Sequence, residues 1–172
     1  MKTYLFEVRF RKHPDVTRTI EVRADQSLAA LHGAIQESIG WRNDHLYSFF
    51  FKPRPEDWVY MRKALEKNCA GLTEFEPMPE GKIKRLVDAE LSGAKMEYAC
   101  PFELEPPRKS SGTRLSSLGL TLGLKFEYLF DYGDNHWFDV QVQQERQVKG
   151  GMKYPRVLAR NGRAPEQYPP CK

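Results

Sequence analysis

The feature that most constrains the fold is a period of two in the apolar side chains near the start of the chain. In residues 4–10 every second side chain is large and apolar, with charged side chains between: Tyr4, Phe6, Val8 and Phe10 against Glu7 and Arg9. This period predicts a half-buried β-strand. Pro14 then interrupts the pattern, because proline cannot sit inside a paired strand. Residues 19–23 alternate again, which predicts a second strand and a hairpin.

A helical period follows the hairpin. Residues 25–27 are of the types that begin helices, and Leu28, Leu31, Ile35 and Ile39 form one stripe that ends before Gly40. His32 falls on the same face, which predicts a buried histidine with hydrogen-bond partners. Residues 45–51 are apolar on both faces, as in a central strand. The order β-β-α-β is typical of a β-grasp-like (ubiquitin-like) opening, so we expect an α+β protein with a mixed sheet.

The rest of the chain divides into an irregular middle and a regular end. Residues 53–112 predict an inserted helical and loop region, with helices over 56–67 and 83–91 and a polar loop over 105–112. Residues 126–130 and 137–143 alternate around a polar turn, which predicts a C-terminal β-hairpin. We therefore expect residues 1–172 to form a single domain, with an insertion at about 53–112 and an extended basic tail at 146–172.

Composition excludes several classes of protein. No apolar run approaches the roughly 20 residues of a membrane span, and the charged N-terminus predicts no signal-peptide core. The three cysteines are far apart and form no CxxC pair, which predicts free thiols and a cytoplasmic protein rather than a disulfide scaffold. Neither a glycine-rich phosphate loop nor a Gly-x-Ser-x-Gly elbow occurs, so we expect no cofactor and no serine nucleophile.

The turn over residues 131–139 is rich in polar side chains and has two interpretations. Asp131, Asp134 and His136 carry ligand types for a divalent cation, which would indicate a metal-dependent hydrolase or nuclease, with His45 as a further ligand. In the second interpretation Asp and Asn side chains cap backbone groups of a tight turn, and Gly133 supplies a positive φ. We favour the second interpretation, because strand residues 131 and 139 would have to converge to hold a metal.

The basic tail suggests a nucleic-acid partner. Residues 146–172 hold seven Lys or Arg against one Glu, and aromatic residues stand among them. Cations beside aromatic rings suit single-stranded nucleic acid, and these residues are Lys153, Arg156, Arg160, Arg163 and Tyr168. The other interpretation is a solvated tail whose Tyr and Pro residues cover the sheet.

These features favour a non-enzymatic binding or interaction module that recognises a protein or nucleic-acid partner. Its expected surface is a polar rim formed by Trp41, His45, Tyr132, Asp134, Asn135, His136 and Trp137. A structural homo-oligomer is a further possibility, and its sign would be an exposed apolar strand edge at residues 4–10. The sequence leaves the oligomeric state open.

Three motifs in the same order resemble the plasmid pRiA4b ORF-3-like family. They are Leu28-x-x-Leu31-His32-x-x-Ile35 with Trp41 and His45-Leu46-Tyr47-x-Phe49, then Leu118-Gly119-Leu120 with Lys125-Phe126-x-Tyr128-x-x-Asp131-Tyr132-Gly133-Asp134, and finally Tyr154-Pro155-Arg156-Val157 with Gly162-x-x-Pro165-Glu166-Gln167-Tyr168.

The resemblance implies a compact α+β domain in a largely uncharacterised family whose names link it to mobile elements. Many members carry a tryptophan and then a histidine after the turn, where this chain has His136 and Phe138 around Trp137. No serine stands in the setting that a resolvase nucleophile needs, so the family's resolvase-like label is not transferred to this chain.

Overall fold

The computed structural model describes residues 1–71, 78–102 and 105–168 and forms one α+β unit around an eight-stranded mixed sheet. The strand order is β5-β4-β3-β6-β7-β1-β2-β8. The helices are α1 (Leu28–Ile39), α2 (Pro55–Gly71) and α3 (Glu80–Leu91), with a 3-10 turn η1 (Leu115–Ser117). The strands are β1 (Lys2–Phe10), β2 (Thr17–Arg23), β3 (Tyr47–Phe51), β4 (Met96–Ala99), β5 (Lys109–Ser110), β6 (Lys125–Phe130), β7 (His136–Gln147) and β8 (Arg156–Asn161).

The predicted β-β-α-β opening is confirmed element by element. β1 and β2 form an antiparallel hairpin through the turn at Pro14. Ser27 caps the N-terminus of α1, and Gly40 ends the helix with a left-handed φ of 79°. β3 lies inside the sheet between β4 and β6, as the apolar character of both its faces predicts. The α+β class and the mixed sheet are therefore confirmed, while the strand order does not establish the finer β-grasp assignment.

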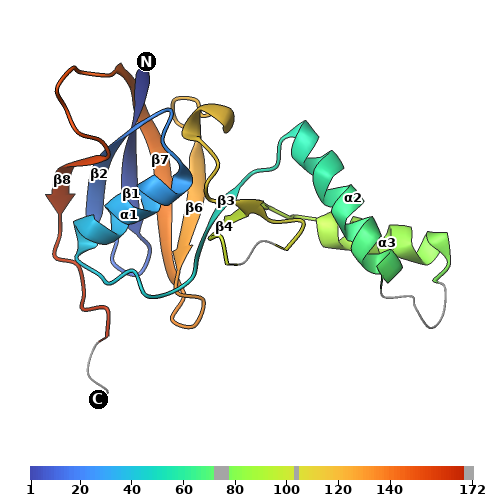
Figure 1. The fold of residues 1–172 in the computed structure, drawn as a ribbon. Coiled ribbons are helices and arrows are strands. Elements are labelled where there is room, and N and C mark those ends of the chain that lie inside the picture. Colours follow the sequence, from blue (N-terminus) through green and yellow to red (C-terminus); the bar gives the residue numbers. More distant parts are fainter. Residues whose placement is uncertain (72–77, 103–104, 169–172) are drawn as a thin grey trace.

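One face of the sheet is covered by α1, and this contact forms the core (Figure 1). Leu28, Leu31 and Ile35 of the helix are fully buried against Phe6 and Tyr128 of the sheet. The side chains at alternate positions of β1, β6 and β7 point to the opposite face, where no helix crosses β1 or β7 (Figure 1). We call this second surface the outer face of the sheet.

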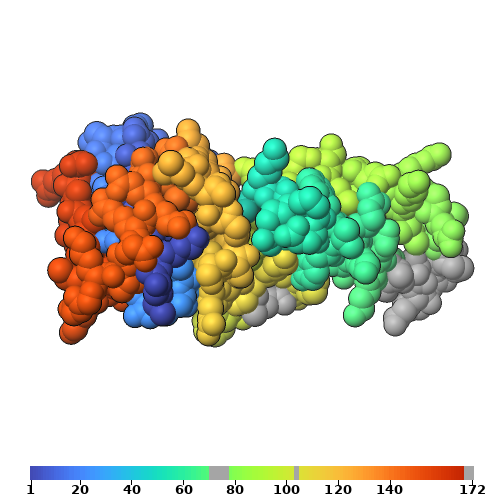
Figure 2. Space-filling view, turned by 90° about the horizontal axis from the view of Figure 1, so that it is seen from above, coloured from blue at the N-terminus to red at the C-terminus, as the bar shows by residue number. Residues whose placement is uncertain are grey.

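The middle of the chain contributes both helices and strands. α2 and α3 form a hairpin that projects beside the β4 end of the sheet (Figure 1), so that the molecule is elongated in the space-filling view (Figure 2). β4 and β5 extend the sheet itself, and β5 lies where the sequence predicted only a polar loop at 105–112. A backbone hydrogen-bond ladder at Lys109 and Ser110 explains the difference, since two residues are too few to show a strand period.

The free strand edge at residues 4–10, which would have been the sign of a structural homo-oligomer, is absent. β1 lies between β7 and β2 and pairs with both, so its backbone groups are already bonded. The outer strands of the sheet are β5 and β8. The edge strand β8 comes from the basic tail and pairs with β2 across more than 130 residues. No local sequence pattern predicts a pairing over such a distance. Within the described ranges, no helix combines the length and apolar character needed to cross a membrane.

Candidate functional site

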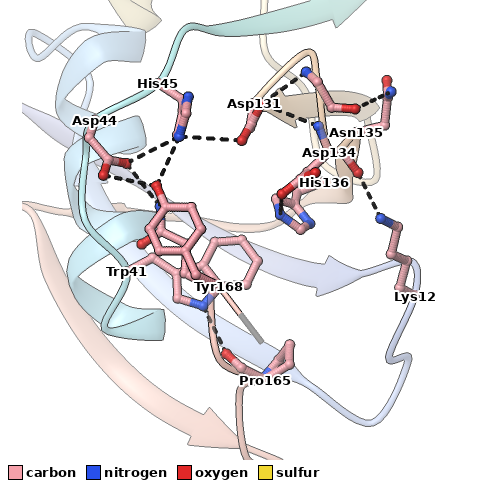
Figure 3. Close-up of polar contacts among 12 residues, drawn as sticks. Lys12, Trp41, Asp44, His45, Asp131, Asp134, Asn135, His136, Pro165 and Tyr168 are labelled. Atoms are coloured by element: carbon pink, nitrogen blue, oxygen red, sulfur yellow. Dashed lines mark hydrogen bonds and ion pairs between the residues drawn. The ribbon is translucent and has the colours of Figure 1, made fainter. Parts of the chain in front are cut away.

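The turn between β6 and β7 is held by the carboxylate of Asp131. Asp131 Oδ1 accepts hydrogen bonds from the backbone N–H groups of Gly133 at 2.8 Å and Asp134 at 3.2 Å (Figure 3). Asp131 and Asn135 adopt left-handed φ values of 59° and 53°. The predicted capping role of Asp is therefore confirmed. The predicted positive φ at Gly133 is wrong: this glycine leaves room for the carboxylate, which lies 3.2 Å from where a Cβ would be.

This geometry predicts how two substitutions of Asp131 differ. Asp131→Ala removes the acceptor for two N–H groups and places a Cβ-bearing apolar residue in the left-handed region, so we expect a loss of about 2 kcal/mol in the free energy of unfolding. Asp131→Asn keeps an acceptor oxygen and tolerates this φ, so we expect a loss below about 1 kcal/mol. Urea unfolding of both variants checks the prediction. Equal losses would show that the negative charge matters more than the turn.

The metal alternative required Asp131, Asp134 and His136 to converge. Asp134 Oδ2 lies 3.9 Å from His136 Nε2. The Asp131 carboxylate instead accepts backbone hydrogen bonds within its own turn. His45 contacts Asp131 instead, with its Nε2 3.5 Å from Asp131 Oδ2. Within residues 1–71, 78–102 and 105–168, no three His, Cys, Asp or Glu side chains group closely enough to hold a metal ion. The turn therefore acts as local structure in this conformation.

A polar cluster joins the end of the chain to the segment after α1. Tyr168 Oη donates to Asp44 Oδ2 at 2.9 Å and lies 2.8 Å from His45 Nε2 (Figure 3). The Gln167 side chain bonds to both backbone groups of Arg42: its Oε1 accepts from the Arg42 N–H at 2.6 Å, and its Nε2 donates to the Arg42 carbonyl at 3.0 Å. We call residues 163–168 the C-terminal strap. These contacts fix the strap to the loop between α1 and β3.

His136 sits beneath this cluster without a hydrogen bond. Both ring nitrogens are buried and have no hydrogen-bond partner among the described residues. The ring packs on Trp41, with centroids 4.6 Å apart. Burial lowers the pKa of His136, and the nearby Lys12 ammonium lowers it further. His136 is therefore a neutral side chain packed among aromatic rings near neutral pH.

The predicted rim does not form one surface. Trp41 is only 8% exposed, because its Nε1 donates to the Pro165 carbonyl under the strap (Figure 3). Tyr132 and Trp137 face elsewhere: Tyr132 Oη bonds to Ser48 Oγ at 2.6 Å, and Trp137 packs on Phe50. Of the seven rim residues, His45, Asp134, Asn135 and His136 lie near the β6–β7 turn, and Trp41 packs on His136 beneath the strap. The side chains of Tyr132 and Trp137 instead contact β3.

The tail cations divide into engaged and free side chains. Arg156 donates two hydrogen bonds to Glu21 Oε2, at 2.8 and 2.6 Å. Arg160 donates to the Ser38 carbonyl at 3.3 Å, at the C-terminus of α1, whose own last turn holds no basic residue. Cations there offset the partial negative charge of the helix end. Lys153 and Arg163 have no side-chain partner within the described part of the chain.

A hollow lies on the outer face of the sheet. It has a volume of about 870 Å³ and runs between the sheet and the beginning of α2. We call it the outer groove, and it is lined by Glu7, Arg9, Phe50, Lys52, Pro53, Trp58, Gly93, Ala94, Lys95, Lys125, Phe126, Glu127, Asp139, Val140 and Gln141. A second hollow of about 550 Å³ adjoins it, sharing Phe50, Ala94 and Lys95.

Comparison with known proteins now places the chain. The family profile described as plasmid pRiA4b ORF-3-like protein matches residues 2–168. The chain belongs to this family. No curated protein matches it. A solved protein of unknown function, MM3350 from Methanosarcina mazei Go1, is similar with a TM-score of 0.63 and 21% sequence identity, over 92% of this chain and 68% of that chain. A likeness at this identity shows a shared fold alone.

The charges along the outer groove of this pRiA4b ORF-3-like protein are unevenly paired. Arg11 bridges two carboxylates, with its Nη2 2.5 Å from Glu127 and 2.6 Å from Asp139. Glu127 also pairs with Lys95. Burial opposes ionisation of Glu127, but hydrogen bonds from Lys95 and Arg11 outweigh it and lower its pKa. Lys52 and Lys125 have no such partner among the described residues, so the unbalanced charge of the groove is positive.

The outer groove of this pRiA4b ORF-3-like protein was not predicted from the sequence. Its charged residues occupy the polar positions of alternating strands, which predict a solvated face. The available signal was Phe50 and Trp137, two large aromatic side chains on that polar side, whose tilted rings contact each other with centroids 5.4 Å apart. Arg11 lies over the Trp137 ring at 5.3 Å. Aromatic side chains on a polar face indicate a surface that contacts something other than water.

Proposed function

We propose that this protein is a non-enzymatic binding module whose partner is a protein, and that the outer groove receives an extended segment of that partner. The observation that carries the proposal is the combination of an apolar floor with two unpaired lysines in one groove. Such a groove suits a segment with an apolar anchor side chain and a neighbouring carboxylate.

The apolar part of the groove comes from both sides of the hollow. Phe50 lies on the sheet, and Trp58 of α2 is 37% exposed at the other wall. Gly93 and Ala94, in the turn after α3, also line the groove, and their small size leaves space between Phe50 and Trp58. Large aromatic side chains supply most of the energy in protein interfaces, because they bury a large apolar area at small conformational cost. A bulky side chain of the partner would fill this space.

The charged side chains of the outer groove favour a partner segment with negative charge. The carboxylates Glu7, Glu127 and Asp139 each have a cationic partner, at Arg9 or Arg11. Lys52 and Lys125 remain available for a ligand carboxylate. An exposed pair of this kind contributes up to about 1 kcal/mol, which is enough to orient a bound segment.

A nucleic-acid partner is less well supported by the same contacts. In the outer groove most cations are already paired with carboxylates, and among the described residues only Lys52 and Lys125 are available, which is few contacts for a chain of phosphates. In the tail, Arg156 and Arg160 are engaged with Glu21 and Ser38, which leaves Lys153 and Arg163 as isolated cations. No contact favours the metal-dependent hydrolase either, because the Asp131 carboxylate caps its own turn.

The proposal extends to organisation and location. We propose that residues 1–172 act as one domain and that 53–112 are an insertion, since α2 and α3 project beside the sheet and build one wall of the outer groove. We also propose a cytoplasmic location, which suits the free thiols of Cys69 and Cys100.

Selection from a random peptide display library tests the function. We expect enriched peptides that combine an aromatic or large aliphatic residue with Asp or Glu. Their binding should fall at least about fivefold on the Lys52→Glu, Lys125→Glu double variant, because two attractive charges become repulsive. Lys149→Glu, outside the groove, is the matched control and should bind as the unchanged protein does. Enriched peptides that bind all three proteins equally would rule out the outer groove as their site.

A further inference from the structure

A second cleft, separate from the outer groove, lies where three parts of the chain meet. It has a volume of about 740 Å³. Its walls are the β1–β2 turn at His13, the segment Gly40–Arg42 after α1, and the C-terminal strap. We call it the strap cleft.

The walls of the strap cleft are held together by hydrogen bonds. Trp41 Nε1 donates to the Pro165 carbonyl at 2.9 Å (Figure 3). Gln167 bonds to both the N–H and the carbonyl of Arg42. On the other side, Gly162 has a φ of 67°, and a Cβ there would lie 2.5 Å from the Asp15 carbonyl oxygen. This close approach fixes Arg163 beside the β1–β2 turn. The cleft is therefore a built feature of the fold.

Two arginines from distant segments, Arg42 and Arg163, are among the residues that line this cleft. Neither Arg42 nor Arg163 has a side-chain ion pair or hydrogen bond with any described residue. His13 lines the same space, and Glu166 is the one acidic side chain among the lining residues. Elsewhere in the molecule, Arg11, Arg18, Arg54 and Arg156 are all bonded to carboxylates or carbonyls. Arg42 and Arg163 differ from these four arginines, because neither of their side chains has such a partner among the described residues.

We propose that the strap cleft is an anion-binding site and that Arg42 and Arg163 together bind a phosphate group. Each guanidinium presents a planar fork of N–H donors that matches a carboxylate or a phosphate. Two forks together suit a phosphate, because it carries more acceptor oxygens and a larger negative charge than a carboxylate. Tyr168, 49% exposed at the wall, offers a ring face to any flat group that the phosphate carries. The strap cleft shares no lining residue with the outer groove, so this site is independent of the proposed peptide-binding function.

Isothermal titration with inorganic phosphate at constant ionic strength tests the proposal. We expect phosphate to bind, and Arg42→Gln and Arg163→Gln each to weaken it about tenfold, the effect of losing one charge-assisted hydrogen bond. Arg163→Lys should fall between, since it keeps the charge and loses the fork. Arg85→Gln, an exposed arginine of α3, is the matched control. Equal affinity in all four variants, or no binding to the unchanged protein, would overturn the site.

Two further titrations separate the sources of the anion. Acetate should bind at least about tenfold more weakly than phosphate, and equal affinities would contradict a phosphate site. Phenyl phosphate that binds more tightly than phosphate, with the difference lost in Tyr168→Ala, would assign a ligand with a ring. Equal affinities for the two phosphates would assign the phosphate group alone, which also upholds the site. Both arginines are exposed and unpaired, so their variants should keep the melting temperature of the unchanged protein.

Discussion

The free energy of unfolding should fall by about 3 kcal/mol as the pH falls from 6.5 to 4, because His32 is buried in its neutral form. His32 is 2% exposed. Its Nδ1 lies 2.7 Å from Tyr128 Oη, and its Nε2 lies 2.7 Å from Asn43 Oδ1. Since Asn43 Oδ1 can only accept, Nε2 carries the proton and Nδ1 accepts from Tyr128. The ring also stacks on Tyr47, with centroids 3.5 Å apart.

The direction follows from the two pKa values. Burial lowers the pKa of His32 from 6.5 to about 4 in the folded protein, although the hydrogen bond to Asn43 opposes the shift. In the unfolded chain this histidine takes up a proton below its ordinary pKa of 6.5. The unfolded state therefore binds more protons between these pH values, so stability is complete above pH 6.5 and is lost as the pH falls to about 4.

Urea unfolding at a series of pH values measures this loss. In His32→Gln the slope between pH 6.5 and 4 should flatten, although the variant is less stable throughout because it loses the stacking contact. His13→Gln removes an exposed histidine and should keep the slope of the unchanged protein. His136 has a lowered pKa as well, so a small slope should remain in His32→Gln. A full slope in His32→Gln would show that other groups cause the acid sensitivity.

Substitution of Glu21 should cost about 3 kcal/mol, because this buried carboxylate joins three strands. Glu21 is 1% exposed on β2. Its Oε1 accepts from Thr3 Oγ1 of β1 at 2.6 Å, and its Oε2 accepts two hydrogen bonds from Arg156 of β8. Burial opposes ionisation of Glu21, but these hydrogen bonds outweigh it and lower its pKa. Glu21→Ala leaves the Thr3 hydroxyl buried and the Arg156 guanidinium without its partner.

Arg156 should therefore contribute to the free energy of unfolding. We expect Arg156→Ala to cost about as much as Glu21→Ala, because it leaves a buried carboxylate unpaired. The double variant should cost clearly less than the sum of the two, since both remove the same interaction. Arg163→Ala, in the same tail, should stay within about 0.5 kcal/mol. Denaturant midpoints of the four proteins check this. Additive losses would show that the two side chains act independently.

Local patterns predicted the parts of the fold that depend on neighbouring residues. The period of 3.6 placed His32 on the buried face of α1, and the structure confirms a satisfied core histidine there. The alternation around residues 131–135 predicted the β6–β7 hairpin, which is confirmed. These features depend on residues a few positions apart, where the chain itself fixes the geometry.

The features that the sequence could not predict depend on pairing over long distances. Trp41 was expected at an exposed rim, but Pro165, 124 residues later, covers its indole. β8 lies in the segment that was expected to be an extended basic tail, and its register with β2 brings Arg156 onto Glu21. The outer groove needs β1, β3, β6 and β7 side by side, with the beginning of α2 next to them. No single segment carries the information for that order.

The most direct test of the central claim is an amide chemical-shift titration of the labelled protein with N-acetyl-tryptophan. This compound carries one aromatic ring and one carboxylate, the two groups that the outer groove is proposed to bind. We predict shifts at Phe50, Ala94, Lys125 and Gln141, with N-acetyl-tryptophanamide binding about fivefold more weakly because it lacks the carboxylate. Shifts at the 131–135 turn alone, or equal affinities for the two compounds, would contradict the account.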